Sequence, residues 1–247
     1  MTNGSEASAE HFVANVLPLY EGPSVKLQLK PSNKEYTISK RLLCSESPVF
    51  SAMFNGEFLE SQQQTVTLEE TKDDVSIRGL EALCQWLYQR TVKFEIEDTT
   101  EHISAAMELT RLANKYDIVG LEAPMAKYIK NLLKFNTYQK DNASSVHYSK
   151  PRDVNTNTYY LTHDHIASAN LLPQRHPVRS VLAAASVEGF LRSATHKFSE
   201  EVQTYPFFGA DLLREVRLAL NKVERHKNVT FIDPISEEKL GIYSEMY

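Results

Sequence analysis

The sequence contains few cysteines and no long apolar run. The first argues against a cysteine metal site, and the second argues against a membrane-spanning protein. The two cysteines, Cys44 and Cys84, stand in no CxxC or Cys/His ligand spacing, and both fall within apolar helical patterns. We expect them to be reduced core residues. No apolar run approaches the ~20 residues that span a bilayer, and no charged-then-apolar leader opens the chain. The sequence therefore predicts an intracellular protein, cytoplasmic or nuclear, without a membrane partner.

An excess of positive charge is also missing. The chain has 27 Lys and Arg against 32 Asp and Glu, a net charge of -5. Contacts to a nucleic-acid backbone are made mainly by Lys and Arg, so we expect no nucleic-acid partner. With 247 residues, 42% of them hydrophobic, the chain is long enough for one folded domain and a second element.

Motifs of catalysis are absent as well: there is no GxSxG, no P-loop and no GxGxxG. The most enzyme-like feature is His163-Asp164-His165, with His176 downstream. Residues two apart cannot share a helical face, and no fourth ligand is evident. A zinc enzyme at this cluster is the weakest hypothesis. We expect no catalytic residue, no metal site, no cofactor and no enzyme activity.

The most informative pattern present is residues 36–60, YTISKRLLCSESPVFSAMFNGEFLE. The first three alternate as a strand requires, and an apolar helical cluster follows at 42–44. Ser47-Pro48 is a helix start, because serine caps free amides and proline tolerates the first helical position. Phe50, Met53 and Phe54 then follow at helical spacing before Gly56 ends the turn.

Residues 24–133 together resemble a BTB/POZ domain. The resemblance is carried by that pattern, by VKLQL (25–29), by SIRGLEALCQWLYQRTVKF (76–94) and by LTRLANKYDIVGL (109–121). It implies an α+β fold in which a small sheet is flanked by helices. Strands are expected at 25–29, 36–38 and 65–68, with 92–96 as a fourth candidate.

The sequence also departs from the family pattern at three positions. Ser24 stands where the family usually has Asp, Ser39 where it has His, and Arg90 where it commonly turns on Gly. The first two positions contribute to a polar pocket at the dimer base in the family. Their loss argues against a ligand-reading role for that pocket.

Four segments are expected along the chain. Residues 1–23 are an N-terminal segment in which Phe12, Val16 and Leu17 form either a dimer arm or a local cover over their own domain. Residues 24–133 are the BTB/POZ domain, and residues 134–160 are a polar linker or loop. Residues 161–247 are a C-terminal all-α region whose patterning resembles BTB-domain-containing proteins of filamentous fungi.

A surface for a partner is implied by Phe58-Leu59-Glu60. This resembles the hydrophobic-x-Glu element of the cullin-binding branch of the family, in which Phe54, Phe58 and Glu60 would contact a cullin. The alternative is that Phe58 closes the domain core and Glu60 is solvated.

Two functions follow from the resemblance. The first is an adaptor: the BTB domain forms a homodimer and docks a cullin ubiquitin-ligase scaffold, while the C-terminal helices recruit an unknown substrate protein. The second is an oligomerisation module of a regulatory or transcription-linked complex, without ubiquitin.

Overall fold

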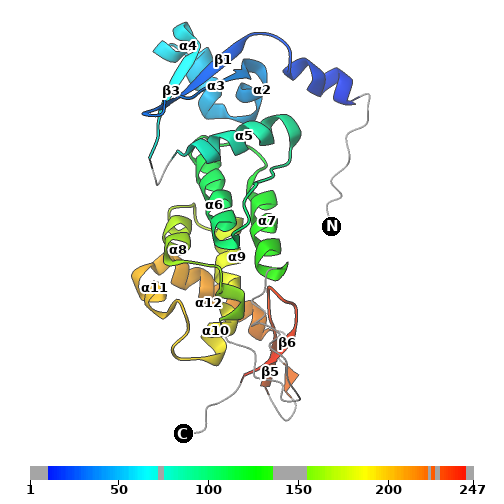
Figure 1. Cartoon of the computed structure of the whole chain (residues 1–247). Coiled ribbons are helices and arrows are strands. Elements are labelled where there is room, and N and C mark those ends of the chain that lie inside the picture. The colour runs from blue at the N-terminus through cyan, green and yellow to red at the C-terminus, as the bar shows by residue number, and fades with distance from the viewer. Residues whose placement is uncertain (1–10, 72–74, 136–154, 222–223, 226–228, 243–247) are drawn as a thin grey trace. The chain divides into compact units, whose positions relative to one another are not determined.

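The computed structural model describes residues 11–71, 75–135, 155–221, 224–225 and 229–242 (Figure 1). By packing, the chain divides into two compact units. Unit 1 comprises residues 1–94 and 111–119, and unit 2 comprises residues 95–110 and 120–247. Each unit is described by itself.

Unit 1 contains the sheet that the sequence predicts. Its strands are β1 (Ser24–Lys30), β2 (Glu35–Ser39) and β3 (Thr65–Glu69), in the order β2-β1-β3. β1 pairs antiparallel with β2 and parallel with β3. Val25, Leu27 and Leu29 alternate along β1 and are fully buried. The fourth predicted strand is wrong: residues 92–96 form neither strand nor helix, because period-2 alternation makes a strand only where a partner edge is available.

Helices cover this sheet. They are α2 (Lys40–Glu46), α3 (Pro48–Asn55), α4 (Leu59–Gln63) and α5 (Ile77–Gln89), preceded by the short turns η1 (Phe12–Val16) and η2 (Leu17–Leu19). The predicted start of α3 is confirmed: Ser47 Oγ accepts the Phe50 amide at 3.0 Å, and Pro48 is the first helical residue. The Phe50 ring then stacks on Tyr116, with 4.5 Å between ring centroids.

Two long helices follow, α6 (Thr99–Lys115), of which residues 99–110 belong to unit 2, and α7 (Glu122–Phe135). The rest of unit 2 is mainly helical. Its shorter elements are η3 (Thr156–Thr158), α8 (His163–Asn170), α9 (Pro177–Ala185), α10 (Val187–Arg192), α11 (Ser199–Thr204) and α12 (Pro206–Leu220). α9 packs against both α7 and α12. Its small side chains, Ala183 to Ala185, allow its neighbours to approach closely.

The C-terminal region is helical as predicted, but the expectation of helices alone needs a correction. A three-stranded antiparallel sheet, β4-β5-β6, follows α12; its strands are Glu224–Arg225, Val229–Ile232 and Lys239–Gly241. Phe231 of β5 is fully buried against Leu212 and Val216 of α12. The strands are too short for a clear alternation in sequence.

The predicted linker, 134–160, lies mostly outside the described residues, since 136–154 are not described. Its last part is integrated into unit 2 rather than exposed as a loop. Asn157 and Thr158 are buried, and Asn157 Nδ2 donates to both carboxylate oxygens of Asp233 at 2.9 Å. The same amide lies 3.3 Å from Glu188 Oε2. A polar composition here reflects a buried network as well as solvation.

Candidate partner-binding surface

The turn between α3 and α4 holds the residues predicted to bind a partner, and its shape depends on Gly56. Gly56 N–H donates to Ala52 O at 2.9 Å and closes α3. A Cβ on Gly56 would lie 2.5 Å from Ala52 O and 3.3 Å from the Phe58 ring. The φ angle of Gly56 is -82°, which any residue can adopt, so close approach alone requires glycine here.

The other end of this turn is fixed by Gln64, which ends α4 in the left-handed region with φ of 51°. Its side-chain amide donates to Ser61 O at 2.5 Å and reaches Phe54 O at 3.5 Å. Its backbone carbonyl accepts Lys26 N–H of β1 at 2.9 Å. Both ends of the segment are therefore tied to the unit 1 framework.

Between these ends Phe58 and Leu59 project into solvent, 59% and 61% exposed. Phe58 precedes the first turn of α4, and its carbonyl accepts Ser61 N–H and Ser61 Oγ at 3.1 and 2.8 Å. Glu60 is half-buried in the first turn, where a carboxylate is favoured by the helix dipole. The exposure of Phe58 is inconsistent with the alternative in which Phe58 closes the core.

Phe54 requires a correction, because it is 1% exposed and lies in the core. Its ring lies 6.3 Å from that of Phe50, and its carbonyl accepts Lys40 Nζ at 2.8 Å. Phe54 therefore belongs to the core beneath the turn, and its side chain is not accessible to a partner.

The described part of the N-terminal segment is attached to unit 1 through Leu19 and Tyr20. Ser39 Oγ donates to Leu19 O at 2.5 Å, and the Tyr20 ring stacks on Tyr88 with 5.6 Å between centroids. Ahead of this attachment Phe12 and Leu17 are 43% and 40% exposed, and Val16 is half-buried. In the single chain these three predicted dimer-arm residues thus leave apolar surface in solvent.

Two of the three departures from the family pattern, Ser39 and Arg90, have structural roles in unit 1. Ser39 caps α2 as well as holding Leu19, and its own N–H donates to Tyr88 Oη at 2.9 Å. Arg90 ends α5 with φ of 56°, the conformation for which glycine is suited. Its guanidinium forms a two-pronged ion pair with Glu46, with 2.7 Å between Nη1 and Oε2. Sequence spacing gave no signal for this pair.

The histidine cluster has structural partners. His165 is buried, which lowers its pKa to about 4, and its Nδ1 accepts Thr162 N–H at 3.1 Å. The neutral ring therefore carries its proton on Nε2 and donates to Ser104 Oγ, 2.9 Å away. Ser104 Oγ in turn donates to Thr100 O at 3.1 Å. In this arrangement the imidazole does not act as a base toward the serine.

The other two histidines point elsewhere. His163 Nδ1 lies 3.1 Å from Glu201 Oε1, and His176 Nδ1 accepts Val178 N–H at 3.2 Å at the start of α9. Within the ranges that the structure covers, no three His, Cys, Asp or Glu side chains are grouped so as to hold a metal ion.

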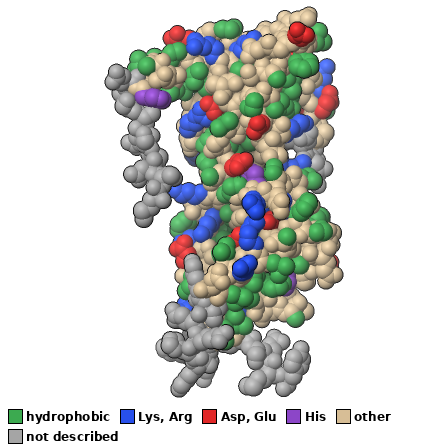
Figure 2. Space-filling view, turned by 180° about the vertical axis from the view of Figure 1, so that it is seen from behind, with side chains coloured by type: hydrophobic (Ala, Val, Ile, Leu, Met, Phe, Trp, Pro, Cys, Tyr) green, Lys and Arg blue, Asp and Glu red, His purple; other side chains and the backbone are tan. Residues whose placement is uncertain are grey.

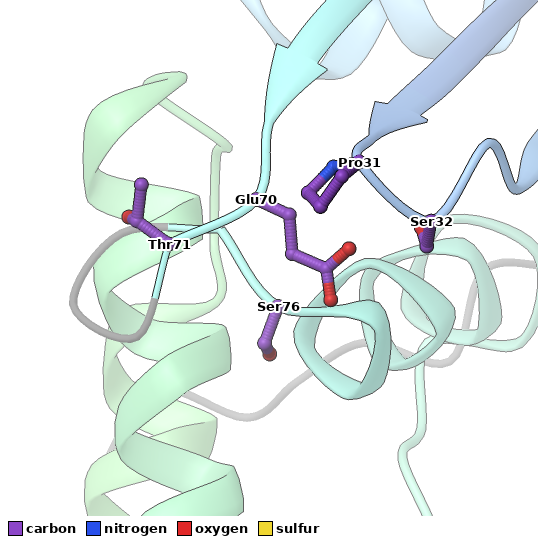
Figure 3. Close-up of a pocket in the computed structure, with 5 residues that line it drawn as sticks. All are labelled: Pro31, Ser32, Glu70, Thr71 and Ser76. Atoms are coloured by element: carbon purple, nitrogen blue, oxygen red, sulfur yellow. The ribbon is translucent and has the colours of Figure 1, made fainter.

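An open depression on unit 1 is lined by Pro31, Ser32, Glu70, Thr71 and Ser76 (Figure 3). Ser76 Oγ is already engaged, because it accepts Gly79 N–H at 2.9 Å as the cap of α5. The other polar side chains of this lining are the Glu70 carboxylate and the hydroxyl groups of Ser32 and Thr71.

The outer surface carries charges of both signs. On the face that Figure 2 shows, Lys and Arg side chains are interspersed with Asp, Glu and hydrophobic ones. No helix within the described ranges has the length and apolar character needed to cross a membrane.

Comparison with known families identifies the fold. Residues 23–133 match the BTB/POZ domain family, so the chain contains a BTB/POZ domain, as the sequence pattern predicted. This is a protein-protein interaction domain, and domains of its kind commonly self-associate. A search of curated proteins found no match to the chain. The four-segment boundaries and the resemblance to fungal proteins remain predictions.

Proposed function

We propose that this protein is an adaptor that self-associates and docks a cullin scaffold, in the cytoplasm or nucleus. The observation that carries the proposal is the turn at 56–64. It presents Phe58 and Leu59 to solvent while Gly56 and Gln64 fix both its ends. An exposed aromatic side chain on a preorganised turn is the kind of anchor that dominates interface energy. Glu60 would meet a polar or basic rim beside that anchor.

Self-association is supported by the N-terminal segment. Phe12 and Leu17 are exposed ahead of the attachment that Leu19 and Tyr20 make to Ser39 and Tyr88. Covering them with a second copy would remove apolar surface from water at about 25 cal/mol per Å². A closed two-fold dimer is the commonest arrangement for such a contact.

Titration against a cullin N-terminal domain tests the docking surface. Phe58→Ala should weaken binding by about 2 kcal/mol or more, roughly 30-fold. Glu60→Lys should mainly slow association and increase its dependence on salt. Val119→Ala is the matched control, because Val119 is 60% exposed in unit 1 and lies outside the turn. Thermal melts of all three variants separate lost binding from lost folding.

The second candidate function is an oligomerisation module without ubiquitin. It is favoured by the exposed N-terminal residues, which need no cullin to be useful. Wild-type protein that dimerises in sedimentation but binds no cullin domain would replace the adaptor proposal with this one. A monomer at tens of micromolar, the order of magnitude for weak association, would refute self-association in both.

A further inference from the structure

The outward face of α12 is apolar and basic. Phe207, Leu213, Leu218 and Leu220 are 54%, 60%, 53% and 41% exposed. At 100° per residue these four side chains, with Ala210, Arg214 and Arg217, fall within one side of the helix. The opposite side, with Phe208, Leu212 and Val216, is buried in unit 2. We call the first set the outer face of α12.

This composition is unusual for the solvent side of a surface helix, which is ordinarily charged and polar. The two acidic residues of α12 are not on it: Asp211 is buried against Arg179, and Glu215 is half-buried. Single exposed leucines are common, but here one helix exposes four large apolar side chains on one side.

The first part of the outer face, up to Arg214, is held in position by neighbouring residues. Near its start, the Arg179 guanidinium lies 5.2 Å from the centroid of the Phe207 ring, and Arg179 is itself fixed by a 2.7 Å bond to Asp211. Arg214 donates to Ser180 Oγ at 2.9 Å. Arg217, further along, is exposed and forms no ion pair with any residue in the described part of the chain. Its charge is available to an incoming group.

The charge pattern distinguishes between occupants. Arg214 is already paired with Asp211 at 3.2 Å and with Glu215 at 3.6 Å. A second copy of this chain, packed face to face across a two-fold axis, would therefore bring the Arg217 side chains of both copies to one contact without a further carboxylate from α12 to balance them. The polar segment 136–154 has three Lys or Arg and two Asp or Glu, so it brings no excess of negative charge to the face. A segment with acidic and apolar side chains could cover the exposed leucines and also pair with Arg217.

We propose that the outer face of α12 binds an acidic amphipathic segment of another protein, with apolar side chains against Leu213, Leu218 and Leu220 and a carboxylate on Arg217. This is helix-in-groove or helix-on-helix recognition, read at i, i+3, i+4 and i+7. The inference deepens the proposed adaptor role, because it assigns the surface that recruits the substrate protein and the chemistry of that substrate.

The test selects ligands without assuming their sequence. A display library of random 16-residue peptides is panned on the full chain, with counter-selection on Leu213→Glu. Enriched peptides should carry more Asp and Glu than Lys and Arg, with apolar residues at helical spacing. Failure to enrich any peptide, or enrichment without an acidic excess, overturns the proposal.

Enriched peptides are then synthesised, and fluorescence anisotropy measures their affinities. Leu213→Glu and Arg217→Glu should each weaken binding at least tenfold. Leu171→Glu is the matched control, because Leu171 is 63% exposed in unit 2 but lies outside α12, and it should leave binding unchanged. Circular dichroism confirms that the variants are folded. Equal affinities in all variants would contradict the assignment.

Two further measurements distinguish other occupants. A change in sedimentation mass on Leu213→Glu would show that a second copy covers the face, and binding to vesicles with 30% phosphatidylserine that Arg217→Glu abolishes would show a lipid surface; either result overturns the proposal. Phe58→Ala should leave peptide binding intact. Wild-type protein that binds the enriched peptides but no cullin domain would refute the proposed function alone. Wild-type protein that docks a cullin domain but enriches no acidic peptide would refute this inference alone.

Discussion

Replacing Gly56 with alanine tests whether close approach shapes the turn that presents Phe58. The backbone of Gly56, with φ of -82° and ψ of -161°, is accessible to alanine. If nothing else mattered, Gly56→Ala would stabilise the protein by about 0.4–1 kcal/mol, since alanine restricts the unfolded chain. The added methyl group would, however, lie 2.5 Å from Ala52 O. That neighbour is backbone within α3 and cannot rotate away.

The contact between the added methyl group and Ala52 O should determine whether Gly56→Ala stabilises or destabilises the protein. Forcing an extra methyl group into a packed site costs about 1–3 kcal/mol, so the net effect should be a destabilisation of about 1–2 kcal/mol. The change should also displace the Phe58 ring, 3.3 Å from the new Cβ, and weaken cullin binding. Urea unfolding followed by fluorescence of Trp86, the single tryptophan of the chain, reports on unit 1 because Trp86 is buried in α5.

Gly120→Ala provides the comparison. Gly120 has φ of +80° and no atom within 4 Å of an added Cβ, so its cost should come from backbone conformation alone, about 1 kcal/mol. This variant should not alter cullin binding, whereas Gly56→Ala should. A Gly56→Ala protein as stable as wild type or more so, with unchanged binding, would refute the role assigned to the Gly56 contact.

Three other changes probe interactions that sequence patterning did not reveal. Burial lowers the pKa of His165 from its ordinary value of 6.5 to about 4 in the folded protein, so stability should be highest above pH 6.5 and should fall as the pH drops toward 4. Between pH 7 and pH 5 this loss should be about 2 kcal/mol, and His165→Gln should reduce it when urea midpoints are followed by circular dichroism. Asn157→Ala should destabilise unit 2 by about 2 kcal/mol in the same assay, because it removes the donor to the buried Asp233 carboxylate; an unchanged midpoint would contradict the network's importance. Arg90→Ala should be less stable than Arg90→Gly by about 1 kcal/mol in Trp86-detected unfolding, since both lose the Glu46 pair but only alanine retains the cost of a positive φ; equal midpoints would show that the left-handed cap has no cost.

Local patterns in the sequence predicted the elements of unit 1 well. The Ser47-Pro48 start, the apolar alternation of β1 and the helical spacing of Phe50 and Phe54 all appear in the structure. The same spacing also contained the information needed to exclude Phe54 from the surface. Residues at i and i+4 share a helix face, so a buried Phe50 implies a buried Phe54.

Other features depend on contacts between residues far apart in the chain, which periodicity does not encode. Asn157 meets Asp233 across 76 positions, and Arg90 meets Glu46 across 44. The sheet β4-β5-β6 has strands of two to four residues, shorter than any window in which alternation is distinguishable from chance. Gly56 was expected to end a helix, but the approach of Ala52 O that requires it is a property of the folded turn.

The turn at 56–64 is held by contacts between near and distant residues, and these contacts position Phe58 for a partner. When a partner immobilises a mobile interface side chain, the lost conformational freedom costs about 0.5–1.5 kcal/mol of binding free energy. Here Gly56 against Ala52, Gln64 against Ser61, and Phe54 in the core fix the backbone that carries Phe58 before any partner arrives. Part of the ordering is then supplied by folding, and the energy of burying Phe58 remains available for affinity. Loosening the turn should therefore weaken binding even when the Phe58 side chain is untouched.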